Sequence, residues 1–226
     1  MKISDVRIYD FEESVVESGL PKSNDPTFNI SRAKTLGNAK IGSGHDCFLK
    51  GILVRFRLTA DHCFWVQFMR YHFADIVSSE SKMHCLTKLK PKYHKFVSKS
   101  SKKQVEKLID IYNNWHDKTN ESIHIPQYNI DMYNNWKDKI IRNNEFLTNE
   151  FTHIPQSTSE MFEAIVMNCP IGLELEAGIT TNFLQLKSMY YQRKNHKMSS
   201  WKDFCNWVKD INNQYKGIIL KQNLQE

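Results

Sequence analysis

The sequence predicts a protein of the α/β (α+β) class, built as one domain over residues 1–226 with a helical insertion at about residues 88–156. Short segments in the first part of the chain alternate apolar and polar residues, as β-strands do. Later segments repeat apolar residues every three or four positions, as amphipathic helices do. Of the 226 residues, 40% are hydrophobic, which is enough to form a core.

Two segments are predicted to be strands. The first, Val6–Phe11, reads VRIYDF and alternates along its length. The second, Gly51–Thr59, is the clearest strand in the chain because its two faces differ. One face carries Ile52, Val54, Phe56 and Leu58, and the other carries Leu53, Arg55, Arg57 and Thr59. Segments 21–29 and 37–46 are rich in Pro, Asn, Asp or Gly and are predicted to be loops.

A helix is predicted directly after the second strand. Asp61 is placed to cap it, and its apolar side carries Phe64, Trp65, Phe68 and Met69. Gln67 and Arg70 are three residues apart, so they are expected to project from nearly the same face. We expect the helix to end near residues 72–74 and the serine-rich stretch after it to be a turn or loop.

Four more helices are predicted from apolar stripes and capping residues. A helix over 103–115 has the stripe Val105, Leu108, Ile109 and Tyr112. Another begins at Ser157, which forms a capping box with Glu160. A third begins at Thr180, burying Phe183, Leu186 and Tyr190 and leaving Asn182, Lys187 and Arg193 off that side. The last begins at Ser199 or Ser200 and buries Trp201, Phe204, Val208 and Ile211.

The net charge of +6 fits an anionic ligand such as a nucleotide, a folate or a nucleic acid. Much of the excess lies in the run Lys82–Lys107, which we interpret as a solvated surface. Nucleic-acid binding by this run is an alternative that the sequence disfavours. Such binding uses aromatic side chains among the charges, and the run offers only Tyr93 and Phe96.

Other classes of protein are excluded by features that the sequence lacks. No apolar run approaches the roughly 20 residues that span a bilayer, and the N-terminal residues do not read as a signal peptide. We therefore expect a cytoplasmic protein with no membrane partner. Five cysteines at wide spacings predict neither a zinc ribbon nor a disulfide framework. The patterns GxSxG, HExxH and GxxxxGK[ST] are absent, and no metal site is predicted from His62, His72 and His84.

Two segments together resemble the flavin-dependent thymidylate synthases, the ThyX family. The family signature RHRxxSxNExSxRY follows an alternating strand and a helix with RQxxRHR, and HxxPFEH lies further upstream. Here GHDCF (44–48), ILVRFRLTA (52–60) and VQFMRYH (66–72) follow in that order. The segment TTNFLQLKSMYYQRKNHKMSSW (180–201) is similar to the family's TxNARSLxNFLxLRxxxxAQWEI. The residues in register with it are Asn182, Leu186, Arg193 and Trp201.

The signature is rewritten at most positions. Arg70 keeps its first arginine, and Gln67 keeps the glutamine three residues earlier. Tyr71 and His72 replace the family's histidine and second arginine. The later signature positions are occupied by Asp75, Val77, Ser78, Glu80, Lys82 and Met83.

The resemblance implies a ThyX-like fold, a central sheet flanked by helices, assembled as a homotetramer with shared sites. It implies conversion of dUMP to dTMP, or a related C5 modification of dUMP or dCMP. FAD, methylenetetrahydrofolate and NADPH would carry the hard chemistry, while the protein orients and polarises the substrate. An enzyme of this kind needs no protein nucleophile, in agreement with the missing catalytic motifs.

By the same resemblance, Arg193 is the expected catalytic residue. Its planar guanidinium would polarise a carbonyl of the pyrimidine ring. The expected substrate-binding residues are Gln67, Arg70, Ser78, Ser79, Glu80 and Lys82. The expected cofactor-binding residues are Thr35, His45, Tyr71, His72, Asn182 and Ser188.

Alternative roles for these residues stay open. The rewritten signature is compatible with a non-catalytic nucleotide-binding homologue on the same fold, for example one encoded by a phage. Arg193 can also serve a purely structural purpose, because a cation is favoured in the last turn of a helix.

Overall fold

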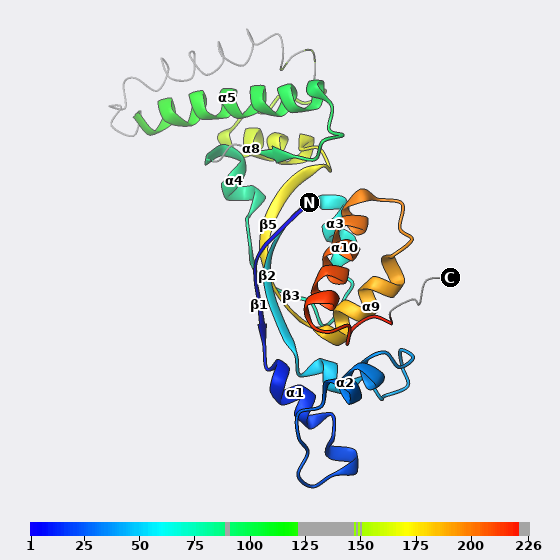
Figure 1. Cartoon of the computed structure of the whole chain (residues 1–226). Coiled ribbons are helices and arrows are strands. Elements are labelled where there is room, and N and C mark those ends of the chain that lie inside the picture. The colour runs from blue at the N-terminus through cyan, green and yellow to red at the C-terminus, as the bar shows by residue number, and fades with distance from the viewer. Residues whose placement is uncertain (89–90, 122–146, 148, 150, 222–226) are drawn as a thin grey trace, which may run out of the picture. The chain divides into compact units, whose positions relative to one another are not determined.

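The computed structural model describes residues 1–88, 91–121, 147, 149 and 151–221 (Figure 1). The chain divides into two compact units, one formed by Met1–Glu80 and Glu174–Glu226 and the other by Ser81–Leu173. Helices and strands are both present, which confirms the predicted α/β class. The single domain with an insertion at about 88–156 stays a prediction, and part of that insertion lies outside the described residues. Across the described residues, no helix is long and apolar enough to cross a membrane.

The first unit contains a sheet and the helices around it. Its strands are β1 (Lys2–Tyr9), β2 (Leu53–Asp61), β3 (Asp75–Ser79) and, apart from its first residue, β5 (Leu173–Asn182). Its helices are α1 (Phe11–Glu17), η1 (Leu20–Lys22), α2 (Ile30–Gly37), η2 (Cys47–Lys50), α3 (His62–Phe68), α9 (Phe183–Arg193) and α10 (Ser199–Gln214).

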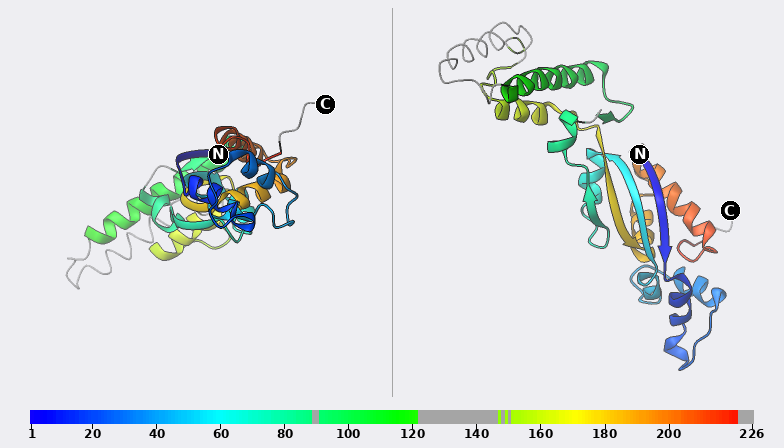
Figure 2. Two further views of the ribbon diagram at one scale, coloured as in Figure 1. Left: turned by 60° about the horizontal axis from the view of Figure 1, so that its bottom comes forward. Right: turned by 90° about the vertical axis from the view of Figure 1, so that its left-hand side faces the viewer.

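The strands of this unit pair antiparallel in the order β1-β2-β5-β3. The pairing of β2 with β5 runs from Leu53 with Asn182 to Asp61 with Glu174 without a shift in register. Figure 2 shows β1, β2 and β5 side by side. The two central strands are therefore distant in sequence and adjacent in space.

Burial alternates along β2 and the residue before it, as the sequence predicts. The inward side chains are at most 2% exposed: Ile52, Val54, Phe56 and Leu58. Helices α3, α9 and α10 cover this face (Figure 1). The predicted stripe of α10 is confirmed, since all four of its residues are buried. Thr59, predicted on the opposite face, is buried too, and its hydroxyl donates to the Glu176 carboxylate (3.2 Å).

Two strands of this sheet, β5 and β3, are missing from the sequence predictions. β5 alternates Leu173, Leu175, Ala177 and Ile179 with polar residues or glycine, so a signal for it exists. It continues to Asn182, and α9 therefore begins three residues later than predicted. The prediction of a turn or loop after residue 74 is wrong, because Asp75–Ser79 pairs with β5 as an edge strand. All five residues of β3 are exposed, so no buried face marks it as a strand in the sequence.

Helix α3 is shorter than predicted. Asp61 caps it as expected, accepting the backbone N–H of Phe64 (3.0 Å), but the helix ends at Phe68. The chain then turns, and the N–H of Tyr71 donates to the carbonyl of Phe68 (3.1 Å). Tyr71 is thereby buried against the core.

This early end changes the position of two side chains. Met69, predicted on the apolar side, is 57% exposed because it follows the last helical residue. Arg70 lies in the turn, so it does not share a helical face with Gln67. The hydroxyl of Thr181 donates to the carbonyl of Phe73 (2.7 Å) and ties the turn to β5.

A buried ion pair joins the loop before η2 to α9. The prediction that Lys187 lies off the buried side of its helix is wrong, since it is 1% exposed. Its Nζ donates to Asp46 Oδ2 (2.5 Å) and to the carbonyls of Gly37 (2.8 Å) and Ala39 (2.7 Å). These oxygens come from a segment far away in the sequence, so the helix alone does not reveal why a lysine is buried.

The second unit contains α4 (Lys82–Lys88), β4 (Lys92–Tyr93), α5 (Lys99–Glu121) and α8 (Thr158–Asn168). The predicted stripe of α5 is confirmed at three positions that are buried: Val105, Leu108 and Ile109. The fourth, Tyr112, packs its ring on Phe162 of α8 with 5.8 Å between centroids. Ser157 caps α8 as predicted, accepting the N–H of Glu160 (3.1 Å).

The variant Lys187→Met is expected to lower the free energy of unfolding by about 3–5 kcal/mol, because it leaves the Asp46 carboxylate buried without a cation. Urea unfolding followed by tryptophan fluorescence measures the change. The exposed Lys197 provides a matched control, since Lys197→Met should shift stability by no more than about 0.5 kcal/mol. Equal unfolding midpoints for the two variants would contradict the stabilising role of the pair.

Candidate functional site

Three side chains from separate elements surround the guanidinium of Arg193. Its Nε donates to the Tyr71 hydroxyl (2.8 Å), and its Nη1 donates to Oε1 of Gln67 (3.1 Å). The same oxygen of Gln67 accepts the indole N–H of Trp201 (3.0 Å). The guanidinium carbon lies 4.7 Å from the Trp201 ring centroid and 5.7 Å from that of Tyr71, within cation–π range. We call these four residues the arginine cluster.

Local structure explains how the cluster forms. Asn182 caps α9 by accepting the N–H of Gln185 (2.8 Å), and Arg193 is the last residue of that helix. Gln67 lies in the last turn of α3, and Trp201 lies in the first turn of α10. Because all three helices cover the same face of the sheet, these helix ends meet (Figure 1).

The cluster leaves the charge of Arg193 uncompensated. Among the described residues, its hydrogen bonds go only to the neutral groups of Tyr71 and Gln67. A guanidinium has five N–H donors, so three of them can still donate to a ligand. A cation held in this way is suited to stabilise negative charge on a bound molecule.

Arg193 and Tyr71 line a pocket of about 390 Å³, which we call the cationic pocket. Its lining residues are Arg70, Tyr71, His72, Phe73, Gln185, Ser188, Gln192 and Arg193. Two arginines and no carboxylate are among them, so the pocket favours an anion. It brings together five of the residues that the sequence predicts for the site: Arg70, Tyr71, His72, Ser188 and Arg193.

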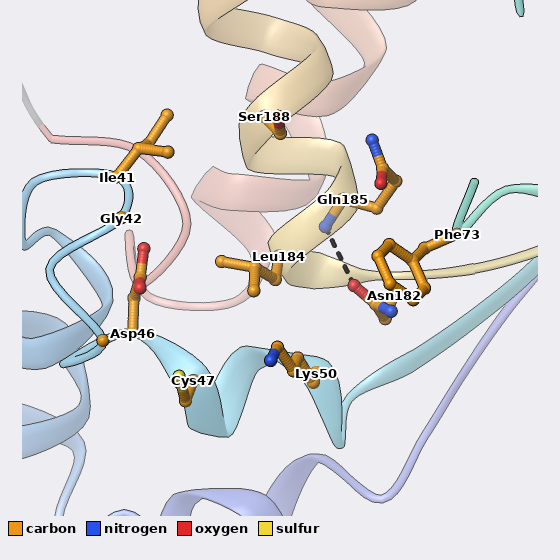
Figure 3. A pocket seen from close by; sticks show the side chains of 11 residues that line it. Ile41, Gly42, Asp46, Cys47, Lys50, Phe73, Asn182, Leu184, Gln185 and Ser188 are labelled. Carbon is orange, nitrogen blue, oxygen red and sulfur yellow. Dashed lines mark hydrogen bonds between the residues drawn. The ribbon is translucent and has the colours of Figure 1, made fainter. Parts of the chain in front are cut away.

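A second pocket, of about 540 Å³, shares Phe73, Gln185 and Ser188 with the cationic pocket (Figure 3). We call it the loop pocket because residues of the loop 41–46 form one wall. Its volume lies within the roughly 300–1,000 Å³ typical of ligand sites. Its other lining residues are Ile41, Gly42, Gly44, Asp46, Cys47, Lys50, Asn182 and Leu184.

The wall of the loop pocket combines two glycines in the left-handed backbone region with a firm anchor. Gly42 and Gly44 adopt positive φ angles of 83° and 80°, which glycine adopts without steric cost. Asp46, at the end of the loop, is held by the buried Lys187. The loop that the sequence predicts at 37–46 is thereby fixed against α9.

Two predicted cofactor residues line neither of these pockets. His45 is exposed and lines a third cavity, of about 770 Å³, which shares Gly44 and Cys47 with the loop pocket. Thr35 is exposed on α2, where its hydroxyl donates to the carbonyl of Ser31 (3.0 Å).

Five predicted substrate residues are absent from the lining of both pockets. Gln67 is one of them and belongs to the arginine cluster, and the other four lie elsewhere. Ser78 and Ser79 lie in β3 and pair with Gly178 and Ala177 of β5. The backbone N–H of Glu80 donates to the Glu176 carbonyl (2.8 Å), and its carboxylate accepts the Glu176 N–H (2.8 Å). Lys82 begins α4 in the second unit.

Two titratable groups near Arg193 have shifted pKa values. Burial and, second, the charge of Arg193 lower the pKa of His196. The ring is therefore neutral at pH 7, and its Nδ1 accepts the N–H of Met198 (3.2 Å). Burial raises the pKa of the Cys205 thiol to about 11, although Lys209 and Arg193 oppose the shift. No cluster of three or more metal-ligating side chains occurs among the described residues.

Sequence reasoning missed several residues of the site. Phe73 and Gln185 line both pockets, and Trp201 holds Gln67, yet none of these roles was predicted. A signal existed for Gln185, because Gln185, Ser188 and Gln192 follow one another at helical spacing on a polar side of α9. The hydrogen bond between Trp201 and Gln67 joins residues that are distant in the sequence, so no sequence pattern indicates it.

No family model matches this sequence, and no curated protein matches it. Among solved structures, the chain is similar to the crystal structure of the flavin-dependent thymidylate synthase ThyX from Helicobacter pylori complexed with FAD and dUMP. The TM-score is 0.54, with 9% identity over 100% of both chains. A second structure of Helicobacter pylori ThyX with FAD and dUMP gives a TM-score of 0.54 and 10% identity, covering 99% of this chain and 100% of that chain. The predicted ThyX-like fold is confirmed.

Replacing Gln67 tests the arginine cluster directly. Gln67→Ala is expected to cost about 1–3 kcal/mol in the free energy of unfolding, because the indole N–H of Trp201 loses its acceptor. Urea unfolding measures the cost. Gln192→Ala is the control, since Gln192 is exposed and, within the described part of the chain, its side chain makes one long hydrogen bond, of 3.3 Å to Ser188. If Gln67→Ala lowered the free energy of unfolding no more than Gln192→Ala does, the hydrogen bonds of Gln67 in the arginine cluster would not contribute to stability.

Proposed function

We propose that this chain is a ThyX-like, flavin-dependent enzyme that modifies C5 of a pyrimidine deoxynucleotide. The reaction would convert dUMP to dTMP or make a related change to dUMP or dCMP. The observation that carries the proposal is the arginine cluster, which lies at a carboxylate-free pocket on a fold shared with ThyX. The two ThyX structures hold FAD and dUMP, and we assign the corresponding ligands to the two adjoining pockets.

The loop pocket fits a flavin in its chemistry. Apolar side chains of Ile41, Phe73 and Leu184 surround a space that also has the polar groups of Asn182 and Ser188 at its edge (Figure 3). A planar ring with polar edges needs this combination. FAD, when bound, would supply hydride transfer, with NADPH as the reductant and methylenetetrahydrofolate as the one-carbon donor.

Cations around the two pockets suit the phosphate groups of both ligands. Lys50 lines the loop pocket, and Arg70 lines the cationic pocket beside the imidazole of His72. An arginine can bind a phosphate with two parallel N–H donors, whereas a lysine acts as a point charge. We assign Arg70 to the nucleotide phosphate, and we assign Lys50 and His72 to the cofactor.

Arg193 is the proposed catalytic residue. Its remaining N–H donors would hydrogen-bond a carbonyl of the pyrimidine and stabilise the negative charge that develops there. Gln67 and Tyr71 hold the guanidinium in place through its Nη1 and Nε atoms. Because these two donors are already occupied, the substrate meets a cation whose orientation is set in advance.

We further propose that the protein acts in the cytoplasm as a homotetramer with shared sites. Ser78 and Ser79 are exposed on the edge strand β3. In such an assembly, their hydroxyls would be available to a nucleotide bound to a neighbouring copy. This arrangement would give the rewritten signature a substrate role that one copy alone does not provide.

A non-catalytic nucleotide-binding protein is the second candidate. The observation that favours it is the position of the Glu80 carboxylate. Glu80 occupies a serine position of the family signature, and its carboxylate accepts the backbone N–H of Glu176. A carboxylate there disfavours a phosphate in the immediate vicinity. This candidate would bind a pyrimidine nucleotide without turning it over.

The absorbance spectrum of the purified protein, before and after adding FAD, separates the two candidates. The enzyme is expected to show a bound-flavin spectrum and to form dTMP from dUMP in the presence of methylenetetrahydrofolate and NADPH, with dCMP tested in parallel. A colourless protein that ignores FAD but binds dUMP would support the non-catalytic candidate. A protein that binds neither would refute both.

Arg193→Lys is expected to reduce kcat/KM by about 10- to 150-fold, since the loss of one charge-assisted hydrogen bond costs about 1.5–3 kcal/mol. The substitution keeps the positive charge and removes the planar fork. Steady-state assays with the productive nucleotide measure the effect, and Arg55→Lys, on the outward face of β2, is the matched control. Equal kcat/KM values for the two variants would contradict the proposal that Arg193 is catalytic.

A further inference from the structure

The positive charge of the chain is concentrated in one segment of the second unit. Residues 91–107 contain six lysines and one glutamate, a net charge of +5, whereas the whole chain carries +6. The lysines lie on β4, on the turn after it and on the first turns of α5. The proposed chemistry of the arginine cluster makes no use of them.

A large aromatic side chain is exposed among these lysines. Phe96 is 80% exposed. The Nζ of Lys95 lies 5.3 Å from the centroid of its ring, and the ring of His94 lies 5.3 Å away at a tilt of 50°. A second pair is formed by Lys102, whose Nζ lies 5.6 Å from the centroid of Tyr93. Aromatic rings and cations therefore alternate over this surface.

The backbone holds Phe96 outward. The N–H of His94 donates to the carbonyl of Gly172 (2.8 Å), and the N–H of Val97 donates to the carbonyl of His94 (2.9 Å). Val97 packs on Gly172 so closely that a Cβ on the glycine would lie 2.3 Å from Val97 Cγ2. Because its neighbours are tied down in a tight turn, the ring of Phe96 is presented to solvent on a fixed support.

The lysines around the ring are available to an anion. Lys92, Lys95, Lys99 and Lys103 are exposed, and no salt bridge to any of them is found among the described residues. Lys99 and Lys103 are four residues apart on α5, so they project from the same side of the helix.

We propose that this surface binds single-stranded nucleic acid. We define the basic aromatic surface as Lys92, Lys95, Phe96, Lys99 and Lys103. The lysines would contact successive phosphates, and a base would stack on Phe96. A single strand is the partner that fits, because only unstacked bases can offer a face to an exposed ring. The sequence alone disfavoured nucleic-acid binding, because it showed few aromatic side chains among the lysines. The structure favours it, because the ring of Phe96 is exposed and its backbone is held in place.

Fluorescence anisotropy of the full chain with fluorescein-labelled 20-nucleotide oligo-dT and oligo-U tests the proposal between 50 and 300 mM NaCl. Binding is expected to weaken with salt. Phe96→Leu, which keeps an apolar side chain without a ring, should weaken it about tenfold. The triple variant Lys92→Gln, Lys95→Gln, Lys99→Gln should reduce the slope of log K against log salt by about 2.

Matched controls lie in the first unit. Lys2→Gln, Lys197→Gln, Lys202→Gln removes the same charge from three exposed positions, and Phe28→Leu changes a half-exposed phenylalanine. Neither control should change the affinity or the slope beyond the small effect of net charge. Absence of binding to both oligonucleotides would overturn the proposal, as would binding that the two surface variants leave unchanged. Phe96-dependent binding to phosphatidylserine vesicles without binding to oligonucleotides would replace nucleic acid with a membrane surface.

Discussion

Antiparallel pairing of β2 with β5 determines where the parts of the candidate site lie. Asp61 ends β2 and caps α3, and Asn182 ends β5 and caps α9. The paired strands run in opposite directions, so the two helices begin at opposite ends of the sheet and cross the same face toward each other. Their last turns meet where Gln67 binds Arg193. One uninterrupted ladder therefore places the guanidinium beside the turn that carries Tyr71.

The pockets depend on a second constraint, which is the burial of charge. Taking Lys187 and Asp46 out of water is costly and is offset only when the partners satisfy each other. Here the ammonium also binds two backbone carbonyls, so all three of its donors are used. The result is a firm connection between α9 and the loop 41–46. Asp46 also lines the loop pocket, which shares residues with the cationic pocket. The flavin and the nucleotide that we assign to these pockets would therefore lie next to each other.

The segment that resembles the ThyX signature has two structural halves. Arg70, Tyr71 and His72 line the cationic pocket, and Tyr71 accepts a hydrogen bond from Arg193 at the position of the family's histidine. Ser78 and Ser79 instead extend the sheet as an edge strand. The first half thus places polar groups at a pocket, whereas the second half is part of the sheet. This division is the physical basis for proposing that neighbouring copies share their sites.

The sequence by itself determined the features that consecutive residues encode. Burial along β2, the stripe of α10 and the caps at Asp61 and Ser157 follow from periodicity and local hydrogen bonding. Only the tertiary structure decided the rest. β3 has no buried face and becomes a strand through its partner β5. Lys187 is buried because Asp46, 141 residues away, receives it, and Gln67, Tyr71 and Trp201 become one cluster because three helices share one face of the sheet. Contacts of this kind depend on which distant segments pack together, and no local pattern records them.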